Sequence, residues 1–125
     1  MTLRVLYVDD DADIREIVTL SLCLDPDIAV ETAPSGAAAL ERARKGGLDL
    51  MLLDVMMPQM DGRTTFSALQ DLALVPPVPV IFVTARTQAH EIAQFKELGA
   101  IGVIAKPFDP MTLAREVRAL HAAAA

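Results

Sequence analysis

Acidic side chains follow two apolar runs that lie far apart in the sequence. Asp9 and Asp10 come directly after the apolar run 3–8, and Asp54 follows the apolar run 48–53. Carboxylates that lie close together repel one another, and some of them bind protons unless a cation lies among them. Oxygen ligands select a hard divalent ion, and an open site with few carboxylates and several waters suits Mg²⁺. If the fold brings the three aspartates together, they predict a magnesium site.

A hydroxyl and an amine follow two further apolar runs. Thr84 comes after the run 80–83, and Lys106 comes after the run 101–105. Mg²⁺ is usually bound together with a phosphate, to which Lys106 offers a positive charge and Thr84 a hydrogen bond. An aspartate held against Mg²⁺ can attack phosphorus and form an acyl phosphate. The metal and the lysine then offset the negative charge of the transition state, so these residue types predict phosphoryl transfer to an aspartate.

This chemistry requires a fold that places the ends of the apolar runs side by side. Runs of strand length alternate with segments of helical periodicity. Strands that are apolar on both faces belong inside a parallel sheet covered by helices on each side. Right-handed crossovers then give an α/β fold with a five-stranded parallel sheet, doubly wound as (βα)5 and flavodoxin-like, which binds ligands outside the carboxyl ends of its strands. The predicted strands are 3–8, 28–32, 48–53, 80–83 and 101–105, and the predicted helices are 12–24, 37–44, 62–73, 88–98 and 110–121.

Local signals mark several helix ends. Ser35 and Asp61 are preferred N-cap residues for the second and third helices. Asp109 and Pro110 predict a cap followed by proline at the first position of the last helix. Prolines lack the N–H group that a helix needs, so those before the fourth strand exclude a helix there. They are Pro76, Pro77 and Pro79.

Composition limits the class of protein and its partners. The 125 residues suit one domain and not two. The net charge of −6 repels phosphate backbones and anionic lipids, so neither nucleic acid nor a membrane is an expected direct partner. No apolar run approaches the ~20 residues that span a bilayer, and residues 1–8 do not form a secretory signal. A cytoplasmic location is expected, and the single cysteine, Cys23, is predicted to be a small buried apolar residue.

The spacing of the first aspartates also raises the alternative of a calcium site. Asp9, Asp11 and Asp13 alternate as in an EF-hand loop. That loop needs glycine at its sixth position and glutamate at its twelfth, where this chain has Ile14 and Leu20. We therefore interpret Asp11 and Asp13 as acidic residues of a first helical turn, where they favour the helix dipole.

Four motifs occur in order at the predicted strand ends. Each is common by itself, but the full set at these positions is specific. With this set, the whole chain resembles the receiver domain of bacterial two-component response regulators, including those of chemotaxis. The motifs are Val8-Asp9-Asp10, Leu53-Asp54-Val55-Met56-Met57-Pro58-Gln59-Met60-Asp61-Gly62, Val83-Thr84-Ala85 and Lys106-Pro107-Phe108.

The resemblance implies a role for each residue of the site. Asp54 is expected to be the phosphoacceptor. Asp10 is expected to bind Mg²⁺ directly, together with Asp54 and the backbone carbonyl of Met56, while Asp9 acts mainly through a water on the metal. Mn²⁺ is a second candidate ion. Lys106 is expected to pair with the phosphoryl group and to precede a cis peptide bond to Pro107.

The resemblance also implies a rim and a switch. Met56, Ala85 and Arg86 are expected at the rim of the site, with Met56 lying over it. Thr84 is expected to move toward the phosphoryl oxygens on activation. Similar proteins have tyrosine or phenylalanine three residues before the lysine, but this chain has Val103 there. Valine has no ring to flip and a stiff χ1 angle, so we predict only a modest rearrangement of residues 86–105.

Three functions fit such a chain to different degrees. The first is a phosphorylation-dependent signalling switch that accepts a phosphoryl group from a histidine kinase or a histidine phosphotransfer protein. The second is an aspartate-nucleophile phosphatase of the haloacid dehalogenase type, which needs a second aspartate two residues after the nucleophile. After Asp54 this position is Met56. After Asp9 it is Asp11, but Asp13 then stands where such enzymes have threonine or valine. The third is an adaptor that works without phosphorylation, which the complete set of acids and Lys106 disfavours. We expect no enzyme activity beyond the chain's own phosphorylation and dephosphorylation.

The resemblance also suggests how the chain is organised and what it contacts. Residues 1–125 are expected to form one receiver domain without an output domain. A downstream protein is expected to bind through residues 88–121, the face that similar proteins usually use. The chain is expected to be a monomer or a weak dimer.

Overall fold

The computed structural model describes residues 2–74 and 78–124, in which five strands alternate with five helices. All the strands are parallel and lie side by side in the order β2-β1-β3-β4-β5. This arrangement confirms the predicted doubly wound, flavodoxin-like sheet. The elements are β1 (Leu3–Val8), α1 (Ala12–Leu22), β2 (Ile28–Ala33), α2 (Gly36–Arg44), β3 (Leu50–Asp54), α3 (Gly62–Asp71), β4 (Val80–Thr84), α4 (Ala89–Leu98), β5 (Gly102–Ala105) and α5 (Leu113–Ala124).

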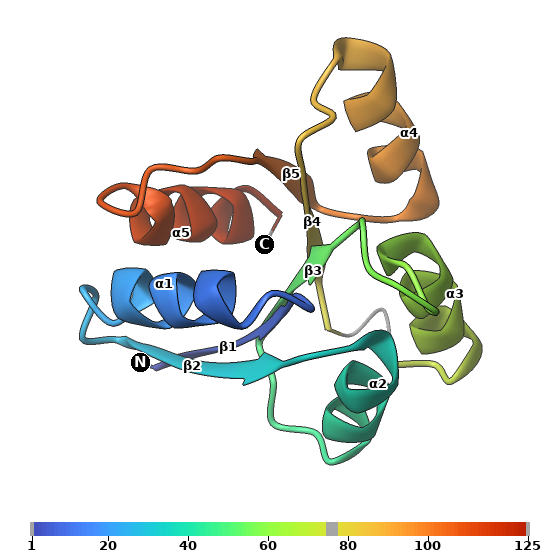
Figure 1. The fold of residues 1–125 in the computed structure, drawn as a ribbon, viewed down its shortest axis with the longest axis horizontal. Helices are drawn as coiled ribbons and strands as arrows, with labels where there is room; N and C mark the ends of the chain where they lie inside the picture. Colours follow the sequence, from blue (N-terminus) through green and yellow to red (C-terminus); the bar gives the residue numbers. More distant parts are fainter. Residues whose placement is uncertain (1, 75–77, 125) are drawn as a thin grey trace.

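Helices cover both faces of the sheet, as Figure 1 shows. Alternate residues of β1 belong to two different cores, because successive side chains of a strand point to opposite faces. Val5 packs with Val18 of α1 and Val117 of α5, whereas Leu6 packs with the core on the side of α2, α3 and α4. The central strands β3 and β4 are buried along their whole length, which explains their continuous apolar sequence.

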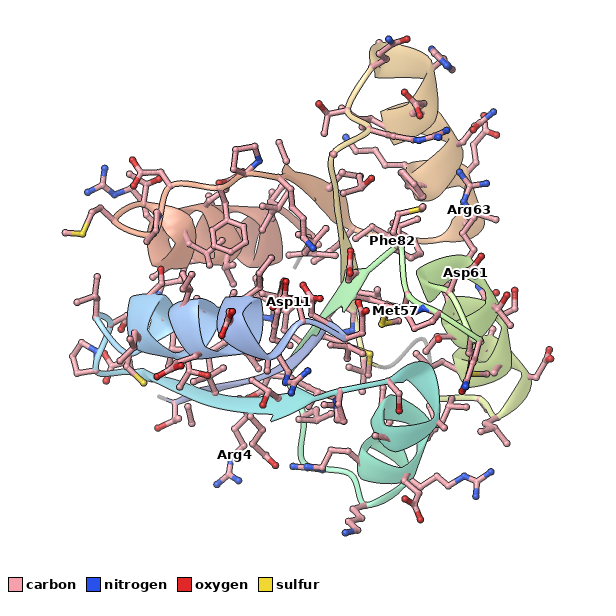
Figure 2. All side chains as sticks on the ribbon, in the orientation of Figure 1. Arg4, Asp11, Met57, Asp61, Arg63 and Phe82 are labelled. Carbon is pink, nitrogen blue, oxygen red and sulfur yellow. The ribbon has the colours of Figure 1, made fainter. Side chains whose placement is uncertain are left out.

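Three phenylalanines connect the sheet to two of the helices that cover it. The ring centroids of Phe66 and Phe82 lie 5.4 Å apart, and those of Phe82 and Phe95 lie 4.8 Å apart. Aromatic pairs at such distances contribute about 0.5–1.5 kcal/mol beyond the burial of their surface. The guanidinium of Arg63 in α3, which Figure 2 labels, lies 4.8 Å from the centroid of the Phe95 ring. A cation–π contact therefore joins α3 to α4.

Some sequence-based predictions are wrong in detail. The last helix begins at Leu113 and not at Pro110, because Asp109 first forms a turn in which its side chain accepts the Met111 N–H and its carbonyl accepts the Leu113 N–H. Cys23 is exposed and not buried, because this C-cap residue of α1 still has helical dihedral angles and its position around the helix lies away from the buried Val18 and Leu22. Helical spacing places Ile17 on the inner side of the first helix, but its side chain is 44% exposed.

The remaining differences concern the ends of elements. The third strand begins at Leu50 and not at Leu48, since Asp49 uses its side chain to accept the Arg4 N–H at 2.8 Å. Ser35 and Asp61 are N-caps as predicted, and each side chain accepts a backbone N–H of its helix. Pro76 and Pro77, which are expected to exclude a helix, lie outside the described residues. Among the helices that the structure describes, none is long and apolar enough to cross a membrane.

Candidate functional site

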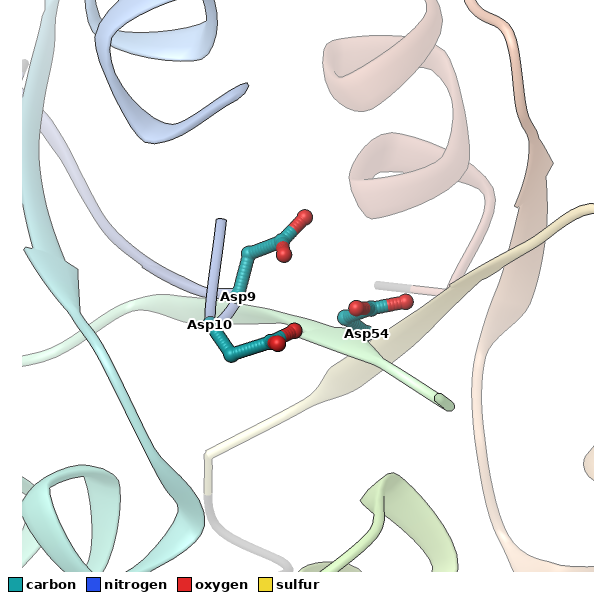
Figure 3. A group of neighbouring side chains, drawn as sticks. All are labelled: Asp9, Asp10 and Asp54. Carbon is teal, nitrogen blue, oxygen red and sulfur yellow. The ribbon is translucent and has the colours of Figure 1, made fainter. Parts of the chain in front are cut away.

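The carboxyl ends of β1 and β3 bring three carboxylates together. One oxygen from each of Asp9, Asp10 and Asp54 can be chosen so that all lie within 4.8 Å of one another, and Figure 3 shows the three side chains around a common space. The two strands are neighbours with Val8 opposite Leu53, so the residues that follow this pair meet at the same edge. Asp9 and Asp54 are buried, whereas Asp10 is exposed.

The carboxylates open into a hollow of about 270 Å³. Residues from the ends of β1, β3, β4 and β5 line it, although they are far apart in the sequence. This is the edge at which open α/β sheets bind ligands. The lining residues are Asp9, Asp10, Asp11, Ile14, Asp54, Met56, Thr84, Ala85 and Lys106.

Lys106 lies between two of the buried acids. Its Nζ atom is 2.9 Å from Asp9 Oδ2 and 3.2 Å from Asp54 Oδ1. Burial lowers the pKa of the Lys106 amine, but hydrogen bonds and charges from the two carboxylates outweigh it, so the net pKa is raised. Lys106 therefore stays protonated and partly neutralises the site. The peptide bond between Lys106 and Pro107 is cis.

The two buried acids differ in their affinity for a proton. Burial and the charge of Asp9 raise the pKa of Asp54 to about 6, even though Lys106 opposes the shift. Burial also acts to raise the pKa of Asp9, but hydrogen bonds from Tyr7, the Asp11 N–H and Lys106 bring it below its ordinary value. Asp9 is thus the fixed anion of the pair, and Asp54 is the more basic oxygen donor.

Tyr7 is a site residue that the sequence-based reasoning missed. Its hydroxyl donates to Asp9 Oδ2 at 2.6 Å, and burial raises the pKa of this phenol above its ordinary value. The apolar run 3–8 by itself indicates only a core residue at this position. The signal that Tyr7 could reach the site is its place two residues before Asp9, since such residues share one face of a strand.

Two of the three predicted rim residues line the hollow. Met56 is 69% exposed and lines the hollow together with Ala85. Arg86 is also exposed, and its backbone N–H donates to the Thr84 hydroxyl at 3.0 Å. Thr84 is buried at the end of β4 and lines the hollow, whereas Val103 lies opposite Phe82 within the sheet and packs against the core below α2, α3 and α4.

The loop after Asp54 returns tightly to the site. The Gly62 N–H donates to the Val55 carbonyl at 2.9 Å, and Asp61 begins α3 as its N-cap (Figure 2). A Cβ atom at Gly62 would lie 2.8 Å from the Val55 Cα and would also overlap the Asp54 carbonyl oxygen. Only glycine lets α3 begin this close to the backbone of Asp54.

The donor atoms of the site suit a divalent cation. Three carboxylates stand at one edge of the sheet, and backbone carbonyls follow Asp54 in the loop. Hard cations such as Mg²⁺ and Ca²⁺ prefer oxygen ligands of this kind. The buried acids carry more negative charge than Lys106 offsets, so the residues fit a bound cation.

Comparison with known proteins supports the family resemblance that the motifs indicate. Residues 5–118 match the model of the response regulator receiver domain. The chain belongs to this family. The receiver fold and the phosphorylation-dependent signalling role predicted from the motifs are thereby confirmed, and the phosphatase and adaptor alternatives are not favoured.

The proteins that this receiver resembles are of different kinds. The chemotaxis protein CheY4 of Vibrio cholerae matches with 33% identity and a TM-score of 0.85 over 96% of this receiver and 99% of that chain. The transcriptional regulatory protein CseB of Streptomyces coelicolor is 38% identical over 117 residues, which are 94% of this receiver and 48% of CseB. A protein-glutamate methylesterase/protein-glutamine glutaminase of Halalkalibacterium halodurans is 40% identical over 114 residues, which are 89% of this receiver and 32% of that enzyme.

The receiver therefore spans about half of CseB and about a third of the methylesterase. What these relatives do outside the matched segment belongs to their other parts. The shared segment is a receiver domain that occurs in proteins with different names.

Proposed function

We propose that Asp54 accepts a phosphoryl group from a histidine kinase or a histidine phosphotransfer protein. The observation that carries the proposal is the position of Lys106, whose Nζ lies 3.2 Å from Asp54 Oδ1 and 2.9 Å from Asp9 Oδ2. An amine there can hold the oxygens of a phosphoryl group that Asp54 attacks. Thr84 stands at the same hollow and offers a hydroxyl to another phosphoryl oxygen.

The reaction transfers a phosphoryl group from nitrogen to oxygen. A carboxylate oxygen of Asp54 forms the new O–P bond while the N–P bond of the phosphohistidine breaks, and its electron pair returns to the imidazole nitrogen. Asp10, Asp54 and the Met56 carbonyl would hold Mg²⁺ directly, with Asp9 acting through a water. When bound, Mg²⁺ offsets negative charge on the phosphoryl oxygens. Mn²⁺, with similar oxygen coordination, would be a substitute.

Hydrolysis of the acyl phosphate needs a water molecule that attacks phosphorus. This chain has no general acid at the position where phosphatases of the haloacid dehalogenase type have one. Met56 occupies that position. Its apolar side chain lines the hollow and carries no titratable group. We infer that the receiver catalyses only its own phosphorylation and slow dephosphorylation, and no turnover of external phosphate esters.

Labelling of Asp54 tests the acceptor assignment. The protein is treated with Mg²⁺ and either acetyl phosphate or beryllofluoride, and the adduct is located by mass spectrometry or by NMR. We expect one adduct, at Asp54, and none in the Asp54→Asn variant. The exposed Asp61, changed to Asn, is the matched control and should label like the wild type. Equal labelling of Asp54→Asn and the wild type would show that the acceptor is another residue.

The proposed partners follow from this role. The phosphoryl donor is a histidine kinase or a histidine phosphotransfer protein. A downstream protein binds through residues 88–121. The acidic chain, with a net charge of −6, supports protein partners over nucleic acid or a membrane surface. Residues 1–125 act as one receiver unit in the cytoplasm, as a monomer or a weak dimer. Crosslinking with and without beryllofluoride, followed by identification of the modified residues, tests whether residues 88–121 form the contact.

A further inference from the structure

Tyr7 places a buried hydroxyl inside the acidic site. The side chain is 1% exposed, and its hydroxyl donates to Asp9 Oδ2 at 2.6 Å. The ring packs in the core between the sheet and the helices α1 and α5. Phenylalanine would fill that core with the same ring and would bury no polar atom. Packing therefore explains the ring of Tyr7 but not its hydroxyl.

The hydroxyl is one of three donors that hold Asp9. Oδ2 accepts hydrogen bonds from the Tyr7 hydroxyl at 2.6 Å and from Lys106 Nζ at 2.9 Å. Oδ1 accepts the Asp11 N–H at 3.0 Å. A carboxylate oxygen has two lone pairs, so both positions on Oδ2 are filled and one position remains on Oδ1. The carboxylate cannot rotate without breaking a buried hydrogen bond.

We propose that Tyr7 is a positioning residue, whose hydroxyl fixes the Asp9 carboxylate so that Oδ2 anchors Lys106 and Oδ1 stays available to a cation or its water. The inference rests on the proposed function of the site, in which Tyr7 acts through the Asp9 carboxylate. Without the hydroxyl, only Lys106 and the Asp11 N–H would hold the Asp9 carboxylate, which would then be less firmly fixed. Partners that hydrogen-bond a metal-ligating group typically change metal affinity about 10–100-fold.

The Tyr7→Phe variant tests the inference through cation affinity and not through labelling alone. Mg²⁺ is titrated into the unphosphorylated protein while the backbone amide signals near Asp54 are followed by NMR. We expect the Mg²⁺ dissociation constant to rise about tenfold or more. An unchanged constant, or tighter binding because the hydroxyl had competed for Asp9, would overturn the inference.

Two further variants separate a positioning role from a structural one. Ser21→Ala is the matched control, because it also removes a buried hydroxyl that donates to a neighbour, here the Pro110 carbonyl. This variant should keep the wild-type Mg²⁺ affinity. In an Asp9→Asn background, Tyr7→Phe should change the affinity less than about twofold, since its effect passes through the missing carboxylate. A loss of about tenfold in that background would contradict the assignment to Asp9.

The outcomes for Tyr7 and for Asp54 are distinct. A wild-type protein that acquires no adduct at Asp54 contradicts the proposed function. A wild-type protein that is labelled at Asp54, and whose Mg²⁺ affinity equals that of Tyr7→Phe, contradicts only the inference about Tyr7. Thermal unfolding of each variant confirms that it is folded before titration.

Discussion

Asp54 is more basic than an ordinary aspartate, because burial and the neighbouring charge of Asp9 raise its pKa to about 6. The folded protein therefore keeps a proton on Asp54 between about pH 4 and pH 6, where the unfolded chain loses it. By linkage, this group lowers stability progressively as pH rises through that window, and its full cost is present above about pH 6.

Removal of this charge should stabilise the protein in the absence of cations. At about pH 8 we expect the free energy of unfolding of Asp54→Asn to exceed that of the wild type by at most about 3 kcal/mol. Each pKa unit is worth about 1.4 kcal/mol. Loss of the contact with Lys106 offsets part of this gain. Urea denaturation with a chelator at several pH values measures the difference. If the difference in unfolding free energy between the two proteins did not decrease from about pH 8 to about pH 4, the raised pKa of Asp54 would be contradicted.

At the scale of elements, the junction between β3 and α3 leaves no room for a side chain. We expect Gly62→Ala to destabilise the protein by about 1–3 kcal/mol, since a Cβ atom would push against backbone and not against a flexible side chain. The displaced Asp54 backbone should also slow phosphorylation about tenfold or more. Urea denaturation and the rate of labelling by acetyl phosphate are the two measurements.

Gly46 supplies the matched control for this change. It has a φ of +74°, and no heavy atom lies within 4 Å of the point that an added Cβ atom would occupy, so Gly46→Ala costs about 1 kcal/mol through backbone conformation alone. Labelling of Gly46→Ala should equal that of the wild type. If both variants labelled alike, the close approach at Gly62 would have no part in positioning Asp54.

Strand β5 and the segment before it bear on how the signal travels. Val103 lies opposite Phe82 in the sheet and contacts the core on the side of α2, α3 and α4. Its stiff side chain offers one well-populated χ1 angle, so we expect beryllofluoride to shift the amide signals of residues 86–105 only modestly. Comparison of NMR spectra with and without the adduct measures this. Large shifts throughout that segment would contradict the prediction.

Sequence patterns predict the elements better than their ends. The continuous apolar runs at β3 and β4 mark buried parallel strands, and the residues that follow them meet at one edge as expected. Asp109 accepts the Met111 N–H as the predicted cap would, but residues 110–112 form a turn and α5 begins only at Leu113, a boundary that the cap signal does not determine. The prediction for Cys23 rests on residue type, whereas its position five residues after the buried Val18 places it on the outer side of a helix.

Some residues of the site could be predicted from the sequence, and one could not. Asp9, Asp10, Asp54, Thr84 and Lys106 could be predicted, because the end of each strand is readable and parallel strands share an edge. The order of the strands does not follow from the residues of any single element. The hydrogen bond of Tyr7 escapes prediction because an aromatic residue in an apolar run is usually only a core residue.

At the scale of the whole molecule, a bound cation should stabilise the fold by mass action. A ligand that binds only the folded state, at about 100 times its dissociation constant, adds about 2.7 kcal/mol to the free energy of unfolding. We expect MgCl₂ to raise the melting temperature of the wild type and to have little effect on Asp10→Asn, in which an exposed carboxylate of the site is lost.

Ionic strength needs its own control in this measurement. The chain carries a net charge of −6, so any salt reduces repulsion among its acids. NaCl at the same ionic strength should stabilise the wild type less than MgCl₂ does. Equal stabilisation by the two salts, or an undiminished Mg²⁺ effect in Asp10→Asn, would show that the cation acts on the surface in general.

The hydrogen bond between Tyr7 and Asp9 has an optical consequence. The chain has one tyrosine and no tryptophan, so its ultraviolet emission arises chiefly from a phenol that touches the carboxylate site. Emission from a phenol depends on the acceptor that its hydroxyl meets. We therefore expect the tyrosine emission of the native protein to change when MgCl₂ is added, and a fluorescence titration of the unlabelled protein measures this.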